Sequence, residues 1–122
     1  MIIDHIGIGL SDYEAGKTFF AAALAPLGIG LIMEIHGNAG YGSGGKPEFW
    51  FSQGTAPARM HIAFVAENRQ QVRDFYQAAL AAGAQDNGAP GIREIYHPHY
   101  YGAFVTGPDG LNIEAVCHAP EA

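Results

Sequence analysis

Apolar and polar residues alternate in two short segments that open with the same dipeptide. Residues 5–10 are HIGIGL and residues 61–66 are HIAFVA. Successive side chains of a strand point to opposite faces, so the isoleucines fall on one face of each segment. His5 and His61 fall on the other face, together with small residues. Both segments are therefore predicted to be strands with one apolar face that is covered and one open face that starts with a histidine.

A polar break and an alanine-rich segment follow each predicted strand. Ser11 and Glu14 have the spacing of a capping box, and Asn68 and Gln71 repeat that spacing. Apolar residues then recur at helical spacing in KTFFAAALA and in RDFYQAALA. The pattern predicts helices that begin near residues 12 and 69 and cover the isoleucine face of each strand.

Residues 5–28 align without a gap with residues 61–84 when His5 is placed opposite His61. An aromatic residue then falls opposite an aromatic residue, and residues 22–25 are identical to residues 78–81. This match favours an internal duplication. The segments with strand character after the helices are GLIMEIHG, PEFWFSQ, GIREIYH, YGAFVTG and LNIEAVCH, and a further strand near residues 39–44 is weakly marked.

These elements predict an α+β fold class with two repeated βαβββ modules. The modules span about 1–54 and about 59–118 within a single domain, residues 1–122. Histidines and small residues share the open faces of the first strands. That placement predicts two sheets that curve together around a cleft.

The composition narrows the class of protein. With 48% hydrophobic and 15% charged residues, the chain suits a compact globule. The net charge is −6 and the six lysines and arginines are spread out, which excludes a basic nucleic-acid surface and disfavours binding to an anionic membrane. One cysteine excludes an internal disulfide. There is no basic leader and no apolar run of bilayer length, so a cytoplasmic location is expected.

Glu114 lies in the middle of an apolar strand segment, LNIEAVC. Burying a carboxylate is costly unless a partner compensates its charge. Arg93 or Arg59 could form an ion pair with it. Alternatively, Glu114 joins His5 and His61, because two imidazoles and one carboxylate form the triad that suits Fe(II) and also accepts Mn, Ni, Co or Zn.

The segment HPHYYG, residues 97–102, contains further candidate side chains. Either it is a hairpin loop with solvated imidazoles, or His97 or His99 moves a proton and Tyr101 donates a hydrogen bond to a substrate oxygen. Aromatic and small residues on the open faces would contact the substrate. The candidate catalytic residues are thus His97, His99 and Tyr101, and the candidate substrate-binding residues are Trp50, Tyr100, Gly7 and Ala63.

The chain resembles the vicinal oxygen chelate superfamily, which contains glyoxalase I, the extradiol dioxygenases and the fosfomycin and bleomycin resistance proteins. The segments that carry the resemblance are IDHIGIGLSD, MHIAFVAENRQQVRDFYQAALAAGA and YYGAFVTGPDGLNIEAV. The last of these, with a Pro-Asp-Gly turn before a strand that holds a glutamate, is the most specific. The resemblance implies a U-shaped cleft around one divalent metal ion bound by His5, His61 and Glu114, and a homodimer. The site would lie within one chain, or His5 would meet His61 and Glu114 of a neighbour.

Trp50 is where this chain departs from glyoxalase I. The repeat places Trp50 opposite Glu114, at the position of the fourth glyoxalase I ligand, and an indole has no lone pair for a metal. A three-ligand site is more similar to that of the extradiol dioxygenases, although Phe104 stands where those enzymes have a tyrosine. The leading hypothesis is a metal-dependent enzyme, a glyoxalase I-like lyase or isomerase or an Fe(II)-type dioxygenase, whose metal chelates adjacent substrate oxygens. The alternative is a metal-free protein of the bleomycin-resistance type that binds a planar drug.

Overall fold

The computed structural model describes residues 3–120, so the first two and last two residues of the expected domain lie outside the described part. The described residues form the predicted βαβββ unit twice. The first module consists of β1 (Ile6–Leu10), α1 (Tyr13–Leu24), the 3₁₀ turn η1 (Ala25–Leu27), β2 (Gly30–Ile35), β3 (Asn38–Gly42) and β4 (Phe49–Gln53). The second consists of β5 (His61–Val65), α2 (Arg69–Ala81), β6 (Gln85–Ile92), β7 (Tyr101–Thr106), the 3₁₀ turn η2 (Pro108–Gly110) and β8 (Asn112–Cys117).

Both helices begin where the sequence predicts, each at a capping side chain. The Asp12 carboxylate accepts a hydrogen bond from the backbone N–H of Ala15 at 3.0 Å, and Asn68 caps α2 in the same way. The cap of α1 is therefore one residue later than the predicted Ser11. Ser11 instead donates its hydroxyl and its backbone N–H to the Asp109 carboxylate in η2. This contact ties the start of α1 to the second module.

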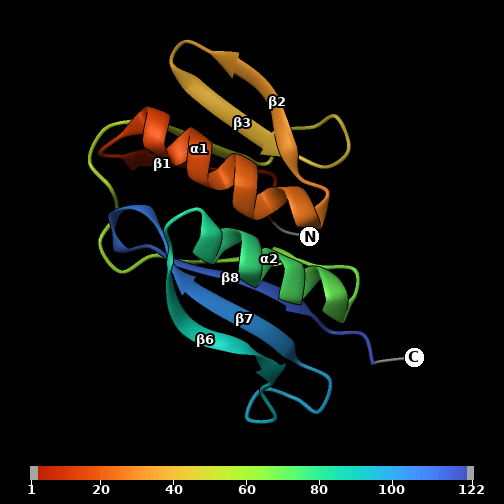
Figure 1. Ribbon diagram of the computed structural model, residues 1–122. Helices are drawn as coiled ribbons and strands as arrows, with labels where there is room; N and C mark the ends of the chain where they lie inside the picture. Colours follow the sequence, from red (N-terminus) through yellow and green to blue (C-terminus); the bar gives the residue numbers. More distant parts are fainter. Residues whose placement is uncertain (1–2, 121–122) are drawn as a thin grey trace.

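The two sheets have the same topology. Their strand orders are β1-β4-β3-β2 and β5-β8-β7-β6, with the first two strands of each order parallel and the others antiparallel. Figure 1 shows α1 and α2 side by side in the middle of the molecule, with β2 and β3 beyond α1 and with β6 and β7 beyond α2. Each helix covers one face of its own sheet. The other face of each sheet, called the open face below, carries the candidate side chains.

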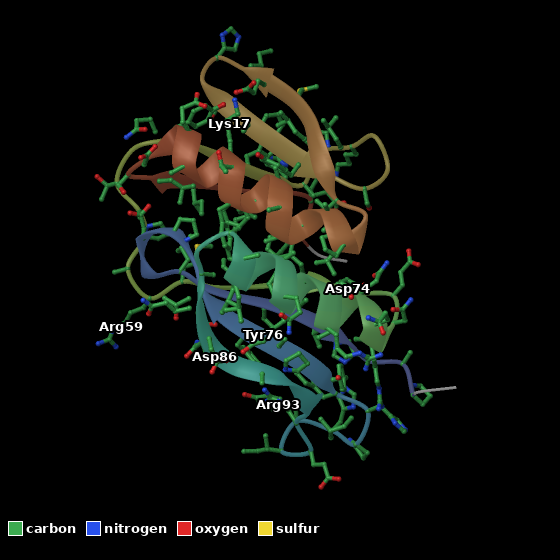
Figure 2. The ribbon with its side chains drawn as sticks, viewed as in Figure 1. Lys17, Arg59, Asp74, Tyr76, Asp86 and Arg93 are labelled. Atoms are coloured by element: carbon green, nitrogen blue, oxygen red, sulfur yellow. The ribbon has the colours of Figure 1, made fainter. Side chains whose placement is uncertain are left out.

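Aromatic rings form much of the core between helices and sheets. Phe20 of α1 packs on Phe49 of β4 with ring centroids 5.0 Å apart, and Phe49 meets Phe64 of β5 at 5.3 Å. The core is thus continuous across the two modules. Figure 2 shows a polar tie at the other side of α2, where the Tyr76 hydroxyl donates to Asp86 of β6 at 3.0 Å. Neither helix in the described range has the length and hydropathy that crossing a bilayer would require.

The predicted strand over GIREIYH, residues 91–97, is wrong. Its place in the sheet is taken by β6, which pairs with β7 from Gln85 to Ile92. Shifts of register at Gly88 and Gly91 let this glycine- and proline-containing segment follow the sheet, although its residues do not alternate in polarity. Residues 93–100 form a loop closed by the hydrogen bond from the Arg93 N–H to the Tyr100 carbonyl, 2.7 Å.

Candidate metal-binding site

Glu114 lies at the centre of the open face of the second sheet. Among the described residues, Glu114 is the one charged side chain that is buried, with 1% of its surface exposed. In the strand register it lies between Ala63 of β5 and Phe104 of β7. Gly102 leaves room for the carboxylate, because a Cβ atom there would lie 2.9 Å from Oε2 of Glu114. The fold therefore builds a place for this carboxylate inside an apolar sheet.

Both carboxylate oxygens of Glu114 are hydrogen-bonded. The Nε2 atom of His61 lies 2.8 Å from Oε1, and the Tyr100 hydroxyl donates to Oε2. These bonds compensate the loss of solvation that burial imposes on the carboxylate. Burial of the phenol, and then its bond to Glu114, raise the pKa of Tyr100. Tyr100 therefore stays protonated as a donor at neutral pH.

The arginines considered as partners for Glu114 lie elsewhere. Among the described residues, the ion-pair partner of Glu114 is His61, and no arginine takes that place. The Arg93 guanidinium lies over the ring of Phe104, 5.4 Å from its centroid. Figure 2 shows Arg59 projecting outward from the loop between the modules. A purely structural arginine–carboxylate pair is thus not what stabilises the buried charge.

His61 and Glu114 are placed as two ligands of one ion would be. Their nearest atoms are 2.8 Å apart, and two neighbouring ligands about 2.1 Å from a divalent ion are about 3.0 Å apart. The His61 ring lies against Phe104, with centroids 5.9 Å apart and planes 22° apart, so its orientation is fixed. Its side chain remains 45% exposed. An imidazole and a carboxylate that meet at an accessible face fit Fe, Mn, Co, Ni or Zn.

His5 does not join this pair within one chain. It is an exposed residue of the first module, and its Nδ1 atom lies 2.8 Å from Asp4. Within residues 3–120, no three His, Cys, Asp or Glu side chains converge closely enough to hold a metal ion. The chain thus brings together two of the three expected ligands.

Trp50 occupies the matching place on the open face of the first sheet. It pairs with Gly7 of β1 as Glu114 pairs with Ala63 of β5. Its ring lies over Gly40 of β3, where a Cβ atom would be 2.8 Å from the indole. A concavity of about 520 Å³ lies beside it. The residues that line this concavity are His5, Gly7, Ile35, His36, Asn38, Lys46, Pro47 and Trp50.

Solved structures with the same architecture identify the fold. A glyoxalase/bleomycin resistance protein from Albidiferax ferrireducens is 26% identical over 98% of this chain and 100% of its own, with a TM-score of 0.83. A glyoxalase/bleomycin resistance protein/dioxygenase family enzyme from Burkholderia phytofirmans is 18% identical over 95% of this chain and 98% of its own, with a TM-score of 0.74. A glyoxalase I mutant from Zea mays is 16% identical, with a TM-score of 0.68, and its match covers 93% of this chain and 46% of its own. No family model and no curated protein sequence matches the chain. The chain shares the fold of these glyoxalase/bleomycin resistance/dioxygenase family proteins, which is consistent with the vicinal oxygen chelate superfamily.

The candidate residues of the segment HPHYYG lie at different places around the second sheet. Tyr100 is in contact with Glu114, as described. Tyr101 is on the helix-covered face, where its hydroxyl accepts a hydrogen bond from Arg73 at 3.3 Å, so the structure does not bring it to Glu114. His99 is exposed, and its backbone N–H donates to Nδ1 of His97 at 3.0 Å.

His118 is a residue that the sequence reasoning missed. It follows β8 directly, and it lies on the face of Glu114 because it is four positions further along an extended chain, in which every second side chain points to the same face. Its Nδ1 atom is 2.7 Å from Nε2 of His97, and its ring lies 5.3 Å from that of Tyr100. Continuing the alternation of β8 past Cys117 would have placed this imidazole beside the site.

Proposed function

We propose that this vicinal oxygen chelate protein is a metal-dependent enzyme for a small molecule with two adjacent oxygens. His61 and Glu114 of one chain and His5 of a second copy hold the metal ion. The observation that carries the proposal is the buried Glu114 carboxylate, which meets His61 at an accessible face. Among the described residues it has no lysine or arginine partner. A divalent cation is the partner that such a carboxylate and imidazole would bind.

A second copy of the chain would supply what one chain lacks. His5 directly precedes β1, and His61 is the first residue of β5. Both strands are edge strands of their sheets and thus open to another chain. Large apolar side chains are exposed around both open faces, including Ile35 at 48% and Val65 at 69%. Covering such residues is favourable by about 25 cal/mol for each Å² of apolar surface that is buried. These features support a homodimer in which the open face of one module meets that of the other module in the partner.

A metal ion in this place would polarise two adjacent substrate oxygens as a Lewis acid. The chain's own residues would orient the ligands and the substrate. Phe104 holds the His61 ring, Tyr100 holds Glu114, and Trp50 forms a flat apolar wall for a planar part of the substrate. This set of roles suits a glyoxalase-like lyase or isomerase and equally an Fe(II)-type dioxygenase. Metal-free binding of a drug, as in bleomycin resistance proteins, remains the alternative prediction.

The test is metal analysis of protein purified without chelator, combined with a complementation experiment. His5→Ala and His61→Ala homodimers should each lack stoichiometric metal. A heterodimer of the two, isolated through different affinity tags, should regain one metal ion. Its intact site takes His5 from the His61→Ala chain, and takes His61 and Glu114 from the His5→Ala chain.

Several results would contradict the proposal. Unchanged metal content in His61→Ala would exclude His61 as a ligand. A monomer at micromolar concentration by light scattering, or a heterodimer without metal, would exclude the site shared between two copies. Absence of metal from the wild-type protein after incubation with Fe²⁺, Co²⁺, Ni²⁺ and Zn²⁺ would favour the metal-free alternative.

A further inference from the structure

Tyr100 is surrounded by a cluster of rings beside the proposed metal site. It is the last residue of the loop 93–100, and its hydroxyl donates to Oε2 of Glu114. Its ring centroid lies 4.7 Å from that of Tyr96, 5.5 Å from that of His97 and 5.3 Å from that of His118. The two imidazoles meet it nearly edge to face, at 74° and 85°. The position of the phenol is thus set by packing on several sides.

The two imidazoles are themselves joined by a hydrogen bond whose direction can be deduced. The backbone N–H of His99 donates to Nδ1 of His97, so that atom carries a lone pair and the proton of neutral His97 is on Nε2. That Nε2–H then donates to Nδ1 of His118 at 2.7 Å. The ring centroids are 5.0 Å apart. This distance equals the 2.7 Å between the two nitrogens plus one ring radius at each end, so the hydrogen bond lies along the line that joins the two ring centres. The pair therefore connects the loop to the end of β8.

We infer that Tyr100 is a positioning residue, which holds one oxygen of Glu114 so that the other oxygen alone faces His61 and the metal ion. The His97–His118 pair keeps the Tyr100 ring in the place where it can do this. The inference rests on the proposed metal site and specifies which carboxylate oxygen of Glu114 faces the ion. It also gives Tyr100 a role other than contact with substrate.

The hydrogen-bond inventory of the side chains supports this assignment. A phenol has one O–H to donate, and in Tyr100 it goes to Oε2 of Glu114. Tyr100 cannot give the same proton to a substrate oxygen. Both nitrogens of His97 are also engaged within the protein. With Oε2 held, Glu114 offers Oε1 to a metal, which leaves more positions on the ion for two oxygens of a substrate.

Tyr100→Phe tests the inference, because it removes the hydroxyl and keeps the ring. Tyr96→Phe is the matched control, since Tyr96 packs on the same cluster but its hydroxyl bonds to no carboxylate in the described residues. In metal-free protein with ¹³C-labelled glutamate, Tyr100→Phe should shift one side-chain carboxyl resonance, and Tyr96→Phe should not. With Co²⁺ as the probe, Tyr100→Phe should lower affinity about 10- to 100-fold. It should also change the visible spectrum of the bound ion, because Glu114 can then use both oxygens.

The two halves of the experiment separate the inference from the proposed function. If Tyr100→Phe leaves all glutamate carboxyl resonances unchanged, or leaves both Co²⁺ affinity and spectrum unchanged, the positioning role is excluded. If the resonance shifts but wild-type protein binds no Co²⁺, Tyr100 positions Glu114 and the metal site is excluded. His118→Ala should weaken Co²⁺ binding in the same direction as Tyr100→Phe but less. Unchanged affinity in that variant would exclude the imidazole pair from the mechanism.

Discussion

The two modules place opposite chemistry at the same position of the same fold. In the first sheet Trp50 lies beside Gly7 on one neighbouring strand and beside Gly40 on the other. In the second sheet the equivalent residue is Glu114, between Ala63 and Phe104. One open face thus has an aromatic wall, and the other has a buried carboxylate.

The neighbours show why each choice fits. The indole of Trp50 extends sideways over the next strand, which is possible because Gly40 has no side chain there. The Glu114 carboxylate needs partners instead. On the next strand, Phe104 packs against the ring of its partner His61, and Gly102 leaves room for its Oε2 atom. Duplication of the backbone therefore does not duplicate the site. In the proposed dimer, the two unlike faces would form the two halves of one pocket.

The largest change in the difference between the modules is expected from removing the charge of the Glu114 carboxylate. Glu114→Gln keeps the shape of the side chain, but an amide is a poor ligand for Co²⁺ or Ni²⁺. We expect the affinity for either ion to fall more than about 100-fold, beyond the effect of losing an outer partner. Isothermal titration calorimetry of the metal-free protein would measure this loss.

Glu48→Gln in the first module is the matched control. Glu48 is an exposed glutamate next to the start of β4, in the module that carries Trp50. Its replacement should leave the affinity for Co²⁺ and Ni²⁺ unchanged. Equal losses in the two variants would show that the carboxylates act through overall charge, and would remove the distinction between the modules.

The difference between the modules is visible in the sequence, because it depends on alternation within single strands. Aligning His5 with His61 places Gly7 opposite Ala63, and the strand registers place Trp50 beside Gly7 and Glu114 beside Ala63. The repeat and both helix starts are also predicted correctly, since caps and apolar periodicity are local signals.

Relations between elements could not be derived in the same way. The bulges that bring β6 to residues 85–92 depend on pairing with β7, so the apolar segment 91–97 was misleading. Tyr101 is a candidate in the sequence but lies away from Glu114, because the register of β7 against β8 pairs Phe104 with Glu114 and Tyr101 with Cys117. Whether His5 meets His61 depends on how modules pack, and alternation within a strand carries no information on that.

A smaller effect is expected from filling the space beside each of the two central side chains. A methyl group at Gly40 would meet the Trp50 ring at 2.8 Å, and one at Gly102 would meet Glu114 at 2.9 Å. Gly40→Ala and Gly102→Ala should each lower the free energy of unfolding by about 1–3 kcal/mol through overpacking. Gly40→Ala alone should also shift the emission of the single tryptophan, and Gly102→Ala should weaken Co²⁺ binding. Urea denaturation and fluorescence would measure these changes.

Gly30→Ala is the control for both variants. Gly30 also lies in a strand, β2, but an added Cβ would meet no atom within 4 Å. Its replacement should change the free energy of unfolding by no more than about 0.5 kcal/mol. If Gly40→Ala and Gly102→Ala are as stable as Gly30→Ala, these glycines do not make room for Trp50 and Glu114.

The smallest effect, and the most direct test of the comparison, comes from making the first module like the second. Trp50→Glu places a carboxylate on the open face, at the position that matches Glu114. We expect the affinity for Ni²⁺ or Zn²⁺ to rise about fivefold, or roughly 1 kcal/mol, because the added ligand must offset the lost packing of the indole. Ser52→Glu is the control, since Ser52 lies on the same face of β4 and two residues away, about 7 Å along the strand. A planar ligand should also quench the emission of Trp50 in the wild-type protein. If Trp50→Glu and Ser52→Glu bind metal equally well and no planar ligand changes the emission, Trp50 does not border the metal site, and the two open faces do not form one pocket.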